Sequence, residues 1–413
     1  MLDKPSFQML SYNEMILLNN YYQHNITPLL VMEILGDLKK ELSEEGEIKT
    51  EKVIELSTKL FPYNAVVNEY YRNLVKHDLL GNNVDISERP ILGNGKLKIS
   101  SSGKKGTHFE PSIAEQALLR WRMGEFLESD KILSAHWRNT TTNKEYVENL
   151  KRQLKSRRIE GKKIKNLDEL NNEVEETLNS PELQFNLLVV CCQNYGLTPA
   201  EANHVLTLWH KAGRHPIKEY APYAAHCLKV DLFYNIGLQF DLMSERPTDK
   251  VDLQYFYYLP FTNLFSSNDR IHRRMIPYFI KNNQTFIIGQ DLKADLKSLV
   301  EYRETLTDSE KESTLKDPPV IETSLTYQLY KKYFNYPASL SLQDDKPKEW
   351  YIKKMKEFEA AVDLGSGNFD GEGEFVAKKS WMSVNDPCPC GSGKALKDCH
   401  LPKDYFDKNR ANP

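Results

Sequence analysis

The chain has 413 residues, of which 27% are charged, and a formal net charge of −3. It is long enough for two or three domains, and its charge excludes a globally basic nucleic-acid binder, though not a local basic patch. No stretch approaches the roughly 18 uninterrupted apolar residues that span a bilayer. The stretch MLDKPSFQMLSYNEM lacks the pattern of a secretory signal, so we expect a cytoplasmic protein without a membrane partner.

The first predicted elements are helices. Residues 12–41 fit a helix, a turn and a second helix that begins near Thr27 and Pro28, because threonine caps helices and proline suits the first turn. Residues 50–80 continue with apolar residues three and four positions apart. Between about 82 and 110 the chain is rich in Gly, Ser and Asn, which predicts an exposed hairpin or loop around PILGNGKLKIS.

Helices resume at Pro111 and lead into a strongly basic segment. Between 151 and 165 Glu160 is the only acid. The basic residues of this segment are Lys151, Arg152, Lys155, Arg157, Arg158, Lys162, Lys163 and Lys165. Two interpretations stay open: a solvated helical hairpin, or an arm that contacts phosphates.

Residues 181–243 are apolar and helical, and within them Thr198 and Pro199 predict the start of a helix. The pattern changes after this region. Two short β-prone runs, TNLFSSND and QTFIIGQD, are each followed by a helical stretch. A strand that alternates with a helix predicts a parallel sheet. We expect a helical extension at 301–362 and a flexible linker at 363–380.

The last segment, 381–413, has the composition of a small metal module. Cys388, Cys390, Cys399 and His400 supply three thiolates and one imidazole, a complete tetrahedral set for zinc. Because four protein ligands leave no position for a substrate, we expect a structural site. The stretch DPCPCGSGKALKDCH resembles the SEC-C family of zinc modules, which implies docking on a partner protein or on nucleic acid.

A second group of candidate residues is acidic. Asp252 is assigned to the start of a helix, and Asp269 follows the strand TNLF. Such carboxylates can converge on a divalent cation at the carboxyl edge of a parallel sheet. The arrangement resembles the second half of a PIN-like nuclease domain, and the resemblance assigns the glutamate of the first half to Glu33, with Asp37 one helical turn later.

The sequence departs from this family where the first strand should end in an aspartate. Asn13, Glu14 or Asp3 is the substitute, and the sequence does not choose among them. The structural alternative is equally simple: Asp252 caps its helix and Asp269 is a turn residue.

These observations predict a helix-rich α/β fold. Its PIN-like parallel-sheet core combines residues 1–45 and 225–300, a long and mostly helical insertion occupies 46–224, and the small zinc module lies at the C-terminus.

The predicted function is that of a bacterial-type, metal-dependent nuclease. Glu33, Asp252 and Asp269 would hold Mg²⁺ or Mn²⁺ and hydrolyse phosphodiester bonds of RNA or DNA. Further candidates for phosphate contact are Arg270, His272, Arg273 and Arg274. The alternative is a non-catalytic adaptor whose helical body and zinc module recruit partners.

Overall fold

The computed structural model describes residues 1–40, 50–60, 65–93, 95–99, 105–156, 162–307, 310–311 and 317–336. Arg157 and Arg158 lie outside the described residues, and so do the predicted linker at 363–380 and the predicted zinc module at 381–413.

Helices dominate the described part of the chain, which is a helix-rich mixed α/β fold with small parallel sheets. In chain order the α-helices are α1 (Lys4–Met9), α2 (Tyr12–Tyr21), α3 (Pro28–Leu35), α4 (Asp37–Lys40), α5 (Glu51–Leu60), α6 (Tyr71–Leu79), α7 (Ile113–Arg122), α8 (Glu128–Thr141), α9 (Lys144–Ser156), α10 (Leu167–Asn179), α11 (Gln184–Asn194), α12 (Pro199–Lys211), α13 (Ile217–Tyr220), α14 (Pro222–Gln239), α15 (Pro247–Gln254), α16 (Arg270–Met275), α17 (Gly289–Glu304) and α19 (Leu325–Phe334). Three short 3₁₀ helices are η1 (Pro181–Leu183), η2 (Tyr255–Phe261) and η3 (Ile276–Tyr278).

The described strands form three pairs. The parallel pairs are β1 (His24–Ile26) with β2 (Ala65–Val67), and β5 (Leu264–Ser267) with β6 (Thr285–Ile288). The antiparallel pair is β3 (Gly95–Ile99) with β4 (Lys105–Phe109). An isolated parallel bridge joins Leu2 to Ser266, so the start of the chain lies along β5.

Two predicted helix boundaries are confirmed. The Thr27 side chain caps α3 by accepting from the Leu30 amide at 3.1 Å, and Pro28 opens that helix. Thr198 caps α12 through a reciprocal capping box with Glu201. These boundaries were predictable because capping depends on local chemistry alone.

The structure differs from the prediction in two places. Residues 65–67 form β2 inside a stretch predicted to be helical, because their buried backbone pairs with β1. Asp252 lies in the last turn of α15, which begins at Pro247, rather than at the start of a helix. The predicted hairpin is confirmed as β3 and β4.

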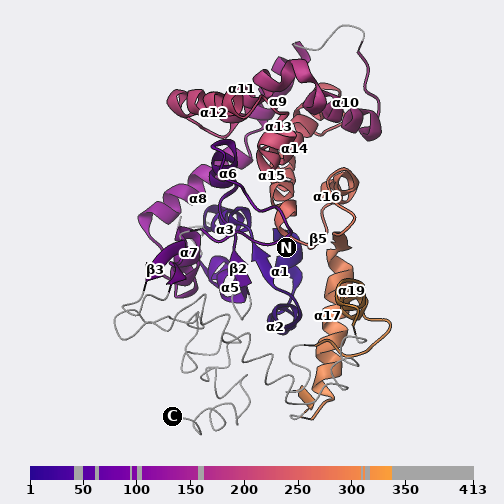
Figure 1. Ribbon diagram of the computed structural model, residues 1–413. Coiled ribbons are helices and arrows are strands. Elements are labelled where there is room, and N and C mark those ends of the chain that lie inside the picture. The colour runs from indigo at the N-terminus through magenta and orange to yellow at the C-terminus, as the bar shows by residue number, and fades with distance from the viewer. Residues whose placement is uncertain are drawn as a thin grey trace.

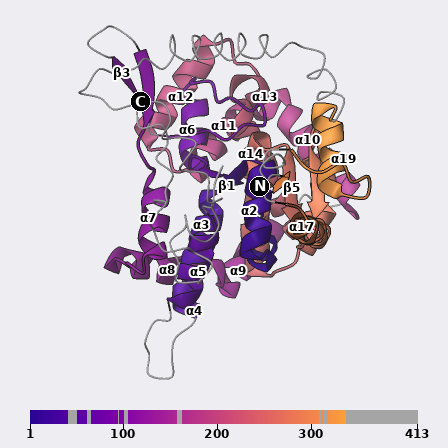
Figure 2. The same cartoon turned by 90° about the horizontal axis from the view of Figure 1, so that it is seen from below.

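The fold places the N-terminal segment next to β5, although the two are far apart in the sequence. Helices α9 to α13 gather at one end of the molecule, and α14 and α15 lead from them toward the N-terminus and β5 (Figure 1). The N-terminus lies beside β5 in this view and in the view from below (Figure 2), as the bridge between Leu2 and Ser266 requires. No helix among the described residues is long and apolar enough to cross a membrane.

Candidate functional site

The first carboxylate of the site comes from Asp3, at the end of the short extended segment that opens the chain. The Ser266 amide donates to the Met1 carbonyl at 3.0 Å, and the Asp3 amide donates to the Ser266 carbonyl at 3.3 Å. Asp3 is 1% exposed and caps α1 by accepting from the Ser6 amide at 2.9 Å. These backbone bonds place the Asp3 carboxylate at the carboxyl end of β5.

Ser267 connects this carboxylate to the other elements of the site. Its hydroxyl donates to Asp3 Oδ2, lies 2.7 Å from His272 Nδ1, and accepts from the Asp269 amide at 2.9 Å. On the far side of the imidazole, His272 Nε2 donates to the Asp252 carbonyl at 2.6 Å. A buried chain of hydrogen bonds therefore joins the N-terminal segment, β5, α16 and α15.

Opposite charges on His272 and Asp3 stabilise this network of hydrogen bonds. His272 Nδ1 lies 3.5 Å from Asp3 Oδ2, and both side chains are 1% exposed. Burial acts to raise the pKa of Asp3, but the hydrogen bond and positive charge of His272 outweigh it and hold that pKa below its ordinary value. Burial likewise acts to lower the pKa of His272, and Asp3 reverses the direction. The pair favours an imidazolium beside a carboxylate.

Two further acids are held in an unfavourable environment for negative charge. Glu33, on α3, accepts a hydrogen bond from the Tyr255 hydroxyl, and burial raises the pKa of Glu33 to about 7. Burial also raises the pKa of Asp252 to about 7, and the nearby charges of Asp269 and Glu33 add to this effect against the opposing charge of His272. Asp252 Oδ2 is buried and accepts no hydrogen bond from the described part of the chain.

The fourth acid, Asp269, is the N-cap of α16. Its Oδ1 accepts from the Ile271 amide at 2.8 Å, so Asp269, which the structural alternative made a turn residue, caps a helix instead. The charges of Asp269 and Glu33 both act to raise the pKa of Asp252, and the charge of Asp3 acts to raise the pKa of Glu33. The four acids therefore influence one another electrostatically.

The three residues left open for the first-strand acid lie in different surroundings. Glu14 closes the capping box of α2 and pairs with Lys293 at 3.2 Å, and Asn13 lies on the same helix. Asp3 alone of the three bonds into the site. Asp37 is engaged elsewhere, because Lys4 pairs with it at 2.7 Å.

Several site residues were not predicted. Tyr255 and Ser267 bond to Glu33 and Asp3, which lie more than 200 positions away, so the local pattern carried no signal for them. Arg246 has a 61% exposed side chain, and its charge lowers the pKa of Asp252.

The candidate phosphate contacts divide into three groups. His272 is fully buried, so its prediction as a nucleic-acid contact is wrong: burial commits its ring to Ser267 and Asp252. The side chains that are exposed on α16 are those of Arg270, Arg273 and Arg274.

In the basic segment, two of the lysines predicted to contact phosphates form ion pairs within the protein instead. Lys151 pairs with Asp241 at 2.6 Å and with Glu245, and Lys155 pairs with Asp241 at 2.8 Å. Arg152 donates to Asn149. These contacts favour the solvated-helix interpretation for α9.

Carboxylate oxygens are the donors that Mg²⁺ and Mn²⁺ prefer. Within the described ranges, however, no group of three or more His, Cys, Asp or Glu side chains is placed to hold a metal ion. Asp3 and Glu33 are bonded to Ser267 and Tyr255 instead. The donor types therefore suit a divalent cation, but their placement in this structure does not form a metal site.

Comparison with known proteins identifies the C-terminal motif. The SEC-C motif matches residues 385–402. The protein translocase subunit SecA of Koribacter versatilis (strain Ellin345) is 42% identical over 57 residues, which are 14% of this chain and 6% of that protein. The chain thus resembles only a small part of this relative. No solved structure matches the chain.

Proposed function

We propose that this protein is a divalent-cation-dependent hydrolase of phosphodiester bonds in RNA or DNA, with a PIN-like active site at the carboxyl end of β5. The observation that supports the proposal is the hydrogen-bonded junction at Ser267, which links Asp3 to the backbone of Asp269. Two further acids, Glu33 and Asp252, have a pKa raised to about 7 and respond to the charges of Asp3 and Asp269.

The electrostatics support a site for a positively charged species. Glu33 and Asp252 are partly buried, and carboxyls with a pKa of about 7 are costly for the protein to keep ionised. Such clusters of perturbed acids occur mostly at functional sites. A cation would offset the repulsion between Asp252, Asp269 and Glu33, and the uncommitted Oδ2 of Asp252 is an available ligand.

When bound, the cation supplies charge to the scissile phosphate and activates the attacking water. Asp252 and Asp269 would hold it together with Asp3 and Glu33. His272 positions Asp3 and the backbone of Asp252 without reaching solvent. Arg246 and Arg270, both exposed on the rim, are placed to attract the phosphate backbone.

The SEC-C motif supports a second component of the proposal. Cys388, Cys390, Cys399 and His400 fall within the matched residues, and we propose that they bind one structural zinc ion. Modules of this kind commonly serve interactions, so the proposed zinc module would hold a protein partner or the nucleic acid near the acid cluster.

The test is cleavage of single-stranded RNA and DNA with Mn²⁺ present. The wild type should cleave at least one of them, and the double variant Asp252→Asn with Asp269→Asn should lose at least 100-fold, a loss of about 2.7 kcal/mol in transition-state stabilisation. Asp85→Asn is the matched control, because Asp85 is an exposed turn residue that bonds only its own loop.

Equal cleavage by wild type and double variant would place any nuclease activity elsewhere. No cleavage by the wild type, with zinc bound and a partner captured through the C-terminus, would favour the non-catalytic adaptor.

A further inference from the structure

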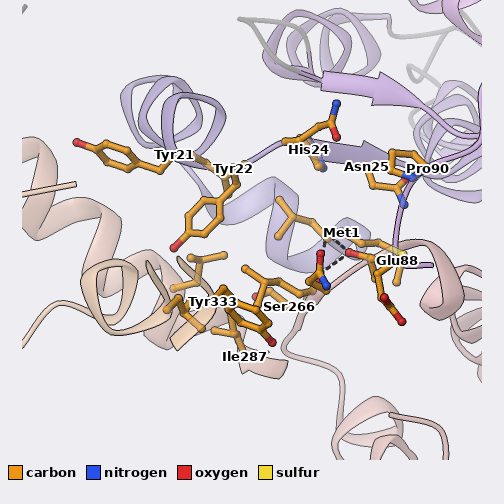
Figure 3. Close-up of a pocket in the computed structure, with 18 of the residues that line it drawn as sticks. Met1, Tyr21, Tyr22, His24, Asn25, Glu88, Pro90, Ser266, Ile287 and Tyr333 are labelled. Carbon is orange, nitrogen blue, oxygen red and sulfur yellow. Dashed lines mark hydrogen bonds between the residues drawn. The ribbon is translucent and has the colours of Figure 1, made fainter. Parts of the chain in front are cut away.

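A cavity of about 400 Å³ lies on the side of β5 opposite the acid cluster. Successive residues of a strand point to opposite faces, and Ser267 bonds into the acid cluster whereas Ser266 lines the cavity. Figure 3 shows Tyr22, His24 and Asn25 on one side of the cavity and Ser266, Ile287 and Tyr333 on the other. The volume falls at the small end of the range for ligand pockets.

Three buried polar side chains of this cavity have hydrogen-bonding atoms that no described residue engages. His24 is 1% exposed, and neither of its ring nitrogens is bonded by the part of the chain that the structure describes. Asn25, 3% exposed, donates its amide to the Phe261 carbonyl at 3.0 Å but leaves its Oδ1 without a partner. The Ser266 hydroxyl, 2% exposed, is also unbonded. Such atoms are costly to bury unless something completes their bonds.

The charges of these groups favour a neutral ligand. Burial lowers the pKa of His24 to about 3, so the imidazole is neutral and offers one donor and one acceptor. Asn25 Oδ1 offers an acceptor, and the Ser266 hydroxyl offers either. The carboxylate of Glu88, which also lines the cavity, lies 3.6 Å from Lys281.

The remaining walls favour a flat ligand. Aromatic rings supply large apolar faces for stacking, and those lining the cavity are Tyr21, Tyr22, Phe261, Tyr330, Tyr333 and Phe334. We propose that the cavity binds an uncharged, planar heteroaromatic molecule of the nucleobase type, hydrogen-bonded by His24, Asn25 and Ser266. This site is separate from the acid cluster, and its occupation does not depend on the proposed nuclease activity.

The test is direct binding to the full chain, by calorimetry and by the midpoint of thermal unfolding. The probes are the four RNA nucleobases and their nucleosides, which separate a free base from a base carried on a sugar. Indole is the comparison, because it has the shape of a purine but only one polar edge atom. We expect at least one base or nucleoside to bind and to raise the midpoint, and indole to bind more weakly.

His24→Phe is the decisive variant. It keeps a buried ring but removes both unbonded nitrogens, so the free protein should unfold at the same or a higher temperature while affinity falls roughly tenfold or more. His226→Phe is the matched control. The His226 imidazole bonds the Phe256 carbonyl at 2.8 Å, so its loss should lower the midpoint and leave binding unchanged.

Ser266→Val removes another polar group that lines the same cavity. Because valine is favoured in strands, this variant replaces His24→Phe if the latter does not fold. It should also weaken binding roughly tenfold or more. The proposal is overturned if no base or nucleoside binds, if indole binds as tightly as the best of them, or if binding is as tight in the variants as in the wild type.

Discussion

At the scale of single residues, the raised pKa values of Glu33 and Asp252 are the most informative property of the acid cluster. Their first cause is burial, and for Asp252 the neighbouring acids add to it. A protein that kept these groups only for stability would gain more from neutral side chains of the same shape. Their retention fits a site that trades stability for function.

The pH dependence of stability follows from these values. The pKa of Glu33 is about 7 in the folded protein and 4.5 ordinarily. Between those pH values the folded state binds more protons than the unfolded state, so stability falls as pH rises through this window and the full penalty is present above it. Glu33→Gln should remove a penalty on the order of 3 kcal/mol at pH 8 and almost none at pH 4.

The measurement is the thermal midpoint of wild type and Glu33→Gln at both pH values, with a chelator present. We expect the variant to gain several degrees at pH 8, since about 1 kcal/mol shifts the midpoint by roughly 2–4 °C in chains of this order of size. A variant that is less stable than the wild type at pH 8 would show that the Glu33 carboxylate is stabilising, contrary to its raised pKa.

At the scale of elements, β5 is the strand on which both proposed sites depend. Its buried hydroxyls alternate: Ser267 bonds to Asp3, His272 and the amide of Asp269, whereas Ser266 has no bonding partner among the described residues. One strand therefore fixes the acid cluster on one face and forms part of a cavity on the other.

This alternation gives a matched pair of substitutions. Ser267→Ala should cost about 1–3 kcal/mol, because it leaves buried polar groups unsatisfied, whereas Ser266→Ala should be nearly neutral. Thermal unfolding of the two variants at one pH is the measurement. If the two variants lose equal stability, Ser267 is not the junction that joins the N-terminal segment to α16.

At the scale of the whole molecule, the chain combines a SEC-C motif, which is contiguous in the sequence, with a proposed PIN-like core, which is assembled from distant segments. The SEC-C motif is short and contiguous, so the spacing of its cysteines was sufficient to predict it, and the family match agrees. The PIN-like core remains a proposal, because it is assembled from residues more than 200 positions apart and no solved structure matches it.

Zinc content tests the C-terminal part of the account. Purified protein should contain about one zinc per chain, and Cys399→Ser should lose it while the unfolding of the helical body stays unchanged. Cys192→Ala is the control, because Cys192 is buried in α11 and should not affect the metal. Full zinc retention in Cys399→Ser would refute the ligand assignment.

The sequence predicted those parts of the fold that local chemistry determines. Thr27 with Pro28 and Thr198 with Pro199 placed two helices, and the strand–helix alternation predicted the parallel pairing of β5 with β6. It did not predict β2, because that strand depends on pairing with β1 rather than on its own pattern.

For the candidate site, too, the sequence did not reveal features that depend on contacts between distant segments. Glu33, Asp252 and Asp269 were found because acids near strand and helix ends are visible in the sequence. Asp3 could not be selected, since the extended segment before it is too short to show a strand pattern and only its bridge to Ser266 places it. The ion pairs of Lys151 and Lys155 with Asp241 were likewise invisible, because they join distant helices and turns.

The central claim is that these four acids form one catalytic site, and Asp3 is the member that the sequence alone could not identify. The most direct test is the rate of Mn²⁺-dependent cleavage by Asp3→Asn, beside the wild type and Asp85→Asn. Asparagine keeps the cap on α1 but removes the charge. We predict a loss of at least 100-fold in Asp3→Asn and none in Asp85→Asn, whereas wild-type cleavage by folded Asp3→Asn would contradict the account.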